Sequence, residues 1–107
     1  MKEIDVQNSI RLALNDIAVV FRANVGVFNT QDGRVVSTGL PKGFSDLFGF
    51  RKIDGRMFFI EVKSKNGKLK KEQMHFLKTM SAYGAITGVA RSAKEAIKIV
   101  EEGKQYK

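Results

Sequence analysis

The sequence predicts an α/β fold on three observations. Apolar residues recur at helical spacing near the amino terminus, again between Lys70 and Tyr83, and once more near the carboxyl terminus. Short runs of branched and aromatic residues, which are typical of strands, lie between these stretches. The dipeptide Asp54-Gly55 separates two such runs and indicates a hairpin. The predicted order is αβββαβα without repeats or an interior linker, so we expect a single domain over residues 1–107.

The amino-terminal half is predicted to contain a helix, a strand and a long loop. An apolar stripe at helical spacing indicates a helix over Glu3–Asp16; its members are Val6, Ile10, Ala13, Leu14 and Ile17. Branched and aromatic residues then predict a strand over Ala18–Phe28. The stretch from Asn29 to Gly43 is rich in turn-forming residues and predicts a loop, with a small hairpin as an open alternative.

The carboxyl-terminal half is predicted to contain two antiparallel strands, a helix, a further strand and a last helix. The first four of these elements are expected at Asp46–Arg51, Met57–Lys63, Lys70–Tyr83 and Ala85–Ala90. The last helix is expected to begin at a capping box on Ser92 and to end at Gly103.

Composition excludes several kinds of site and favours a polyanionic partner. The chain has 19 Lys and Arg against 11 Asp and Glu, a net charge of +8, which favours nucleic acid. The absence of cysteine and the single histidine exclude disulfides, thiolate nucleophiles and metal sites built on Cys or several His. No apolar run approaches the roughly 20 residues that span a bilayer, and the amino terminus lacks a signal-peptide segment. We therefore expect no membrane partner and a cytoplasmic location.

The strongest local motif is Ile60-Glu61-Val62-Lys63. Because strand side chains alternate, Glu61 and Lys63 share one face with Met57 and Phe59. A carboxylate and an ammonium that follow two apolar residues on one face indicate a polar site there. The alternative is that this strand end simply emerges into solvent.

Asp46 adds a second carboxylate to the same face. A symmetric two-residue turn at Asp54-Gly55 would pair Asp46 directly with Lys63 and make Glu61 its diagonal neighbour. Two carboxylates at that separation repel each other unless a cation lies between them, and oxygen ligands suit Mg²⁺ or Mn²⁺. The alternative is a cross-strand Asp46–Lys63 salt bridge on a solvated face.

Polar residues also extend the apolar stripes of the first two helices. Glu3 and Gln7 continue the stripe of the first helix, and Gln73 lies within that of the second. Each one alone fits the solvated rim of an amphipathic helix. Together they are expected to face the sheet that carries Asp46 and Glu61.

A lysine cluster directly follows the Glu-Val-Lys strand. Its members are Lys65, Lys68, Lys70 and Lys71. We expect these side chains to bind backbone phosphates, although a solvated flexible turn is the alternative. Aromatic residues do not interleave with the lysines, so recognition of shape and backbone is expected rather than base stacking.

In this arrangement the chain resembles the VRR-NUC (virus-type replication–repair nuclease) domain of the PD-(D/E)XK nuclease superfamily, in its stand-alone phage-type form. The matching elements are Glu3 with Gln7, Gly43-Phe44-Ser45-Asp46, Glu61-Val62-Lys63, Glu72-Gln73 before Phe76-Leu77, and Gly88-Val89-Ala90-Arg91-Ser92. Ser45 stands where the superfamily name has proline, at a position that supplies no ligand. The resemblance implies an αβββαβ(α) core with a mixed central sheet flanked by helices.

The resemblance also implies roles for site residues. Asp46, Glu61 and the backbone carbonyl of Val62 would bind Mg²⁺ or Mn²⁺, and Glu3 would act through metal-bound water. Lys63 would orient the attacking water and offset charge on the scissile phosphate, while Gln73 would help to shape the site.

The function implied is a metal-dependent, structure-selective DNA endonuclease. Relatives of the stand-alone form act on branched DNA, and this form is expected to cut four-way (Holliday) junctions as a homodimer in a bacterial or phage-infected host cell. No small-molecule cofactor is expected. The alternatives are a noncatalytic basic module that binds nucleic acid and a nuclease of the flap type.

Overall fold

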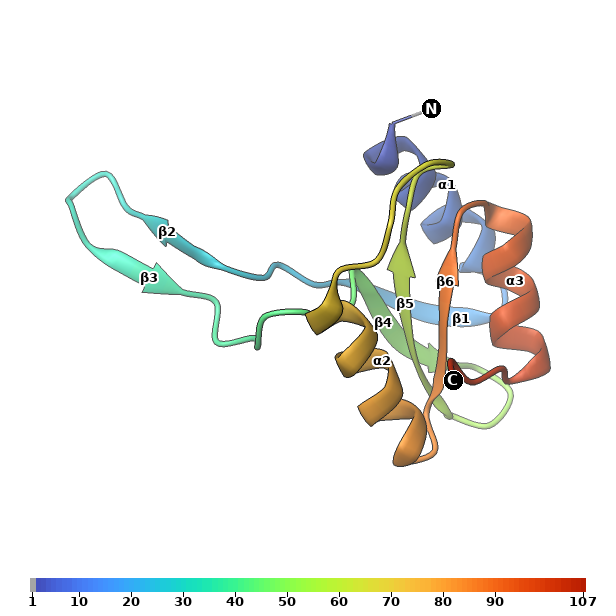
Figure 1. Cartoon of the computed structure of the whole chain (residues 1–107). Coiled ribbons are helices and arrows are strands. Elements are labelled where there is room, and N and C mark those ends of the chain that lie inside the picture. The colour runs from blue at the N-terminus through green and yellow to red at the C-terminus, as the bar shows by residue number, and fades with distance from the viewer. Residues whose placement is uncertain (1) are drawn as a thin grey trace.

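The computed structural model describes residues 2–107 and shows a four-stranded mixed sheet flanked by three helices (Figure 1). The elements, in chain order, are α1 Glu3–Leu14, β1 Ala18–Arg22, β2 Val27–Asn29, β3 Val35–Ser37, β4 Leu47–Arg51, β5 Met57–Val62, α2 Lys71–Ala82, β6 Ile86–Ala90 and α3 Ala93–Glu102. The main sheet has the order β1-β4-β5-β6. Only the β5–β6 pair is parallel. The predicted mixed α/β architecture is therefore confirmed.

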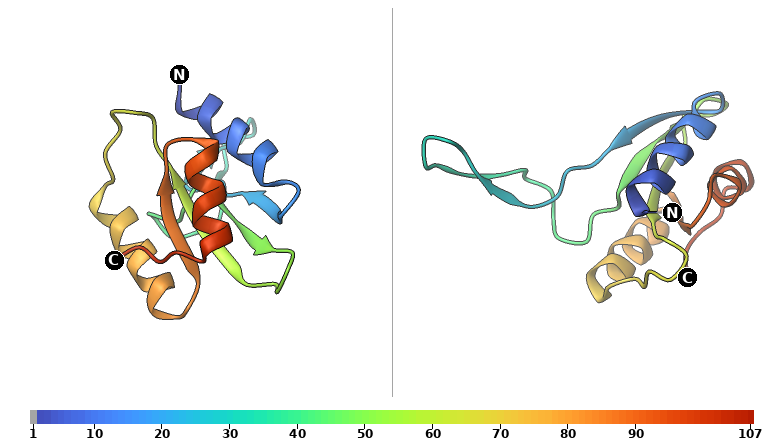
Figure 2. Two further views of the ribbon diagram at one scale, coloured as in Figure 1. Left: turned by 90° about the vertical axis from the view of Figure 1, so that its right-hand side faces the viewer. Right: turned by 90° about the horizontal axis from the view of Figure 1, so that it is seen from above.

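The helices cover opposite faces of the sheet. Helices α1 and α3 lie on one face and α2 on the other (Figure 2). Phe58, Ile60 and Val62 of β5 point into the core under α1 and α3. Phe59 points to the α2 face and packs with Phe76. The predicted alternation along β5 is confirmed, and it places Glu61 and Lys63 on the α2 side of the sheet.

The predicted strand Ala18–Phe28 is wrong in its second half. Strand β1 ends at Arg22, because its partner β4 begins at Leu47 and offers no further strand residues to pair with. The chain then leaves the sheet through Gly26, whose φ of 132° few other residues adopt. Beyond this point β2 and β3 form a separate hairpin that projects from the core (Figure 1). We call residues 24–43 the arm; the hairpin left open as an alternative is therefore present.

The predicted register of the β4–β5 hairpin is also wrong. Leu47 pairs with Ile60, which shifts the pairing by two residues from the symmetric two-residue turn and leaves every side chain on its predicted face. The cause is a longer turn, in which the Arg51 N–H donates to the carbonyl of Arg56 at 3.0 Å. The Asp54 carboxylate stabilises this turn by accepting hydrogen bonds from the Arg51 guanidinium and the Arg56 backbone. Asp46 therefore lies opposite Glu61 rather than opposite Lys63.

The predicted helices are present with small differences at their ends. Helix α1 ends two residues before Asp16, and α2 spans Lys71–Ala82 rather than Lys70–Tyr83. The Ser92 cap is confirmed, since its hydroxyl accepts a hydrogen bond from the Glu95 N–H at 3.2 Å. No helix among residues 2–107 is long and apolar enough to cross a membrane.

Candidate active site

Asp46 is held in place through both its side chain and its backbone. It lies just before β4, and its Oδ2 accepts a hydrogen bond from the Val62 N–H at 2.9 Å. Its own carbonyl accepts the Ala23 N–H, also at 2.9 Å. The β4–β5 hairpin therefore fixes the carboxylate, while the root of the arm is hydrogen bonded to the same residue.

The residues before Asp46 pack this segment against α2. Gly43 adopts a φ of 91°, and a Cβ at this position would collide with the carbonyl oxygen of Glu72. Only glycine fits there without displacing the start of α2. Ser45 is fully buried, and its hydroxyl donates to the Leu47 carbonyl at 2.9 Å. The Gly-x-x-Asp motif thus has a backbone role in addition to the carboxylate it supplies.

Glu61 and Lys63 are buried, with side chains 1% and 7% exposed. The alternative that they emerge into solvent is therefore wrong. Glu61 Oε2 has no hydrogen-bond partner among residues 2–107. Burial, together with hydrogen bonding to Asp46 and the negative charge of Asp46, raises the pKa of Glu61 to about 9. Lys63 opposes this increase in the pKa by its positive charge.

The second alternative, an Asp46–Lys63 salt bridge, is not observed. Four ion pairs occur among residues 2–107, and none joins these two side chains. The shifted register explains this, because Asp46 faces Glu61 across the hairpin. The strands thus bring two carboxylates together with no direct ion pair to Asp46.

Helix α1 contributes Glu3 to this region and buries a second polar side chain, that of Gln7. Gln7 is 7% exposed, and its Oε1 has no hydrogen-bond partner within the described part of the chain. Glu3 is exposed, but it lies close enough for its charge to raise the pKa of Glu61. The interpretation of Gln7 as a solvated rim residue is therefore wrong. An unsatisfied buried amide oxygen indicates that a donor or a cation belongs there.

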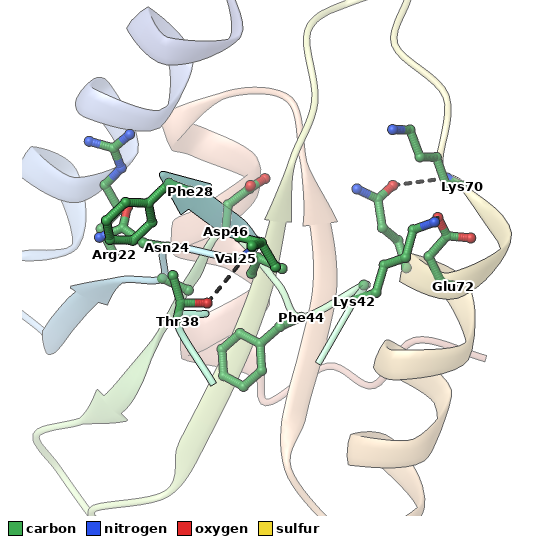
Figure 3. Close-up of a pocket in the computed structure, with 15 residues that line it drawn as sticks. Arg22, Asn24, Val25, Phe28, Thr38, Lys42, Phe44, Asp46, Lys70 and Glu72 are labelled. Atoms are coloured by element: carbon green, nitrogen blue, oxygen red, sulfur yellow. Dashed lines mark hydrogen bonds and ion pairs between the residues drawn. The ribbon is translucent and has the colours of Figure 1, made fainter. Parts of the chain in front are cut away.

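Gln73 caps the start of α2. Its Oε1 accepts a hydrogen bond from the Lys70 N–H at 2.8 Å. Gln73 and Asp46 line the same cleft of about 770 Å³, so the structure brings these two predicted site residues together. The cleft lies between the root of the arm and α2 (Figure 3).

Sequence reasoning missed several residues of this cleft. Arg22, Lys42 and Phe28 line it, two of them from the arm and one from the end of β1 (Figure 3). Nothing in the local pattern of residues 22–43 indicates this placement, because it depends on where β1 stops and how the arm leaves the sheet. The one available signal was the short length of the β4 segment, which limits how many residues of β1 can pair with it.

The lysine cluster is exposed on a loop with a fixed backbone. The side chains of Lys65, Lys68, Lys70 and Lys71 face solvent. The Arg91 guanidinium donates to the carbonyls of Ser64 and Gly67, both at 2.7 Å. These bonds join the loop to the segment between β6 and α3. The loop backbone is therefore held in place, unlike the flexible turn of the alternative interpretation.

The donor set fits a hard divalent cation. No group of three or more His, Cys, Asp or Glu that could hold a metal occurs among residues 2–107. The available ligands are therefore two carboxylates, Asp46 and Glu61, together with main-chain oxygen such as the Val62 carbonyl. The unpartnered oxygen of Glu61 and the raised pKa of its carboxyl are both relieved by a bound cation. Oxygen-only ligands with several waters are typical of Mg²⁺.

A mixed sheet that carries a paired Asp and Glu and a buried Lys on one face, beside a basic cleft, defines a nuclease-type domain. The family model of the VRR-NUC domain matches residues 28–94. This chain belongs to the VRR-NUC family. It is also similar to a solved structure of a VRR_NUC domain, with 25% identity and a TM-score of 0.64, over 92% of this chain and 94% of the other. No curated protein matches the chain.

Proposed function

We propose that this chain is a Mg²⁺- or Mn²⁺-dependent endodeoxyribonuclease that cuts branched DNA, above all four-way junctions, as a homodimer. One observation carries the proposal: Glu61, 1% exposed, faces Asp46 and keeps one oxygen without a hydrogen-bond partner among residues 2–107. A buried carboxylate without compensation is costly. A fold that retains one beside a second carboxylate is suited to a cation.

Asp46, Glu61 and the Val62 carbonyl are the residues that would hold the metal. When bound, the metal lowers the pKa of water and stabilises negative charge on the scissile phosphate. Glu3 would accept a hydrogen bond from water at the site, since it lies near enough to Glu61 to affect the pKa of that carboxyl. Helix α1 begins at Glu3 and contacts β5.

Lys63 supplies the positive charge that the reaction needs close to the phosphate. Its ammonium lies near enough to Glu61 to affect the pKa of that carboxyl. A buried ammonium interacts more strongly with a developing negative charge than an exposed one does, because less water screens it. Lys63 therefore orients the attacking water and stabilises the charge that develops on the phosphate.

DNA is the substrate that the charges favour. The exposed lysine cluster follows β5 directly, so phosphates that flank the cut would lie beside Lys65, Lys68, Lys70 and Lys71. One chain carries one Asp46, one Glu61 and one Lys63. Paired cuts across a symmetric four-way junction need two sites related by a two-fold axis, which a homodimer supplies. Such DNA would be met in the cytoplasm of a bacterial or phage-infected host cell.

A noncatalytic basic module is the second candidate, and the paired carboxylates disfavour it. Asp46 would only repel phosphate in a protein that binds DNA without a metal, and the buried Glu61 would serve no purpose there. A flap-type nuclease would use the same residues with a single site. The flap-type nuclease would make one cut in each substrate molecule, whereas the homodimer would make two.

Cleavage of matched DNA substrates tests the proposal. Labelled four-way, flap and linear duplexes of equal length are incubated with Mg²⁺, with Mn²⁺ or with EDTA. We expect paired cuts on the four-way junction with either metal and none with EDTA. Binding without any cleavage in either metal would favour the noncatalytic module, and single cuts confined to flaps would favour the flap-type nuclease.

A further inference from the structure

The arm exposes large apolar side chains to solvent. Phe28 in β2 is 54% exposed, and Val35 in β3 is 69% exposed. A two-stranded hairpin is marginally stable by itself in water. An arm of this length that projects from the core therefore has a surface suited to a binding partner (Figure 1).

The two apolar residues differ in where they lie. Because side chains alternate along a strand, Phe28 and its partner Val36 face one way, whereas Val35 faces the other. Phe28 lines the cleft that also contains Asp46 and Gln73 (Figure 3). Val35 does not line this cleft. Phe28, unlike Val35, therefore lies next to the candidate active site, as does its neighbour Val27.

The cleft around Phe28 is basic. Arg22, Lys42 and Lys70 line it against the two acids Asp46 and Glu72. Lys42 pairs with Glu72 at 3.7 Å, which leaves Arg22 and Lys70 as the cleft cations without an ion pair among residues 2–107. An aromatic ring among cations is the combination that binds unstacked bases together with their phosphates. A second copy of the chain at this surface would bring like charges together, so the charges favour a polyanion.

The root of the arm is fixed relative to the site. The Ala23 N–H donates to the Asp46 carbonyl at 2.9 Å. Farther along, the Thr38 N–H donates to the Gly26 carbonyl at 3.0 Å, and the Gly26 N–H donates to the Thr38 hydroxyl at 3.3 Å. These hydrogen bonds join the segment just before β2 to the segment just after β3, at the base of the hairpin. The position of Phe28 is therefore coupled to that of Asp46.

We propose that Phe28 stacks on a base that is unstacked at the branch point of DNA held in the cleft, with Arg22 binding the adjacent phosphate. This inference rests on the proposed function and deepens it, since it names the feature of the substrate that is recognised. Bases within a linear duplex are paired and stacked, whereas those at a branch can be unstacked at smaller cost. Phe28 is then a specificity-determining residue that favours branched DNA over linear DNA.

The test compares binding of Phe28→Ala, Phe28→Trp and the control Val35→Ala with that of the wild-type protein. Each is titrated in Ca²⁺ with a four-way junction and with a linear duplex of the same length, and its mass is measured by light scattering. We expect Phe28→Ala to weaken junction binding by about tenfold and to leave duplex binding unchanged, because one base–aromatic stack is lost. Phe28→Trp and Val35→Ala should bind the junction like the wild-type protein.

A spectroscopic readout follows the stacking itself. With 2-aminopurine at the branch point, the wild-type protein and Phe28→Trp should quench fluorescence relative to Phe28→Ala. Equal junction binding by Phe28→Ala, or an equal loss on the linear duplex, would overturn the inference. So would a halved mass of Phe28→Ala, which would make the arm a contact between copies. A wild-type protein with no preference for branched DNA would instead count against the proposed function.

Discussion

Asp46 Oδ2 accepts a hydrogen bond of 2.9 Å from the backbone of Val62, the residue between Glu61 and Lys63. The bond crosses the β4–β5 hairpin and joins the Gly-x-x-Asp and Glu-x-Lys motifs directly. The side-chain alternation of β5 then places Glu61 and Lys63 on the face that Asp46 occupies. The geometry of the site thus follows from one hairpin and one side-chain to backbone bond.

The first prediction concerns catalysis. Asp46→Ala and Lys63→Ala should each lower the cleavage rate by about a hundredfold or more, because Asp46 would hold the metal and Lys63 stabilises the charge that develops on the phosphate. Junction binding in Ca²⁺ should survive, since neither residue belongs to the lysine cluster. Single-turnover cleavage with Mg²⁺ and parallel binding titrations measure the two effects. Cleavage at the wild-type rate by either variant would show that the site is assigned wrongly.

The second prediction concerns pH and metal. Burial raises the pKa of Glu61 to about 9 in the folded protein, above the roughly 4.3 of an unfolded chain. Its contribution to stability is therefore fully present below about pH 4 and is lost as the pH rises through the folded value. Glu61→Gln removes this dependence. In EDTA at pH 8 the variant should melt several degrees above the wild-type protein, and the difference should shrink toward pH 4.

Metal should reverse that order. Mn²⁺ at pH 8 should raise the melting temperature of the wild-type protein, because a ligand that binds only the folded state stabilises it. Glu61→Gln should gain little, since it offers the cation a neutral amide. Thermal unfolding with and without Mn²⁺ makes the comparison without any nuclease assay. An equal increase in melting temperature in the two proteins would mean that Glu61 does not bind the metal.

The third prediction concerns the lysine cluster. Replacing Lys65, Lys68, Lys70 and Lys71 by Gln should weaken binding to every DNA shape. The slope of log affinity against log salt should fall by about 2 if two phosphate contacts are lost. The control is the exposed pair Lys94 and Lys98, which lies on α3 at the opposite face of the sheet from α2. An unchanged slope in the cluster variant, or an equal change in the control, would mean that DNA lies elsewhere.

The fourth prediction concerns Arg91 as a positioning residue for that cluster. Arg91→Ala removes the hydrogen bonds to the Ser64 and Gly67 carbonyls and should free the loop backbone. Trypsin should then cut more rapidly after Lys65 and Lys68, and DNA affinity should fall severalfold with the salt slope retained. Arg11→Ala is the matched control, because this exposed arginine on α1 makes no hydrogen bond or ion pair with the loop among residues 2–107. Unaltered proteolysis would mean that the loop is held by other contacts.

Side-chain alternation made the face of each strand residue predictable, while the register and the arm depended on more distant contacts. Glu61, Lys63 and Asp46 share a face in any register shifted by an even number of residues. Their shared face was therefore predicted correctly although the turn was not. The turn itself was wrong because Arg51 binds Asp54 and lengthens it. The point where the chain leaves the sheet was predicted wrongly because Val25, Val27 and Phe28 favour a strand, but β4 offers them no partner.

Burial was the other feature that the sequence did not reveal. A Glu and a Lys at the end of a strand are exposed in most proteins. Here α2 and the aromatic cluster around Phe44, Phe48 and Phe59 cover that face of the sheet. Gln7 was visible as a member of the α1 stripe, but its unpartnered oxygen appears only when the helix packs against the sheet.

The fifth prediction concerns assembly. One chain supplies one set of Asp46, Glu61 and Lys63, whereas resolving a four-way junction requires cuts in two strands at related positions. A two-fold homodimer provides both sites at once, each with its own lysine cluster beside the DNA. We therefore expect a mass of about 24 kDa, twice the 12.0 kDa of this chain.

Light scattering during size exclusion at micromolar protein, with and without junction DNA, measures this mass. Mixing wild-type protein with an excess of Asp46→Ala then tests whether both sites are needed. In a dimer that exchanges subunits, mixed dimers carry one active site, so paired cuts should give way to single nicks as the variant increases. A monomer under both conditions that still makes paired cuts would refute the dimer, and a monomer that makes only single nicks would shift the substrate toward flaps.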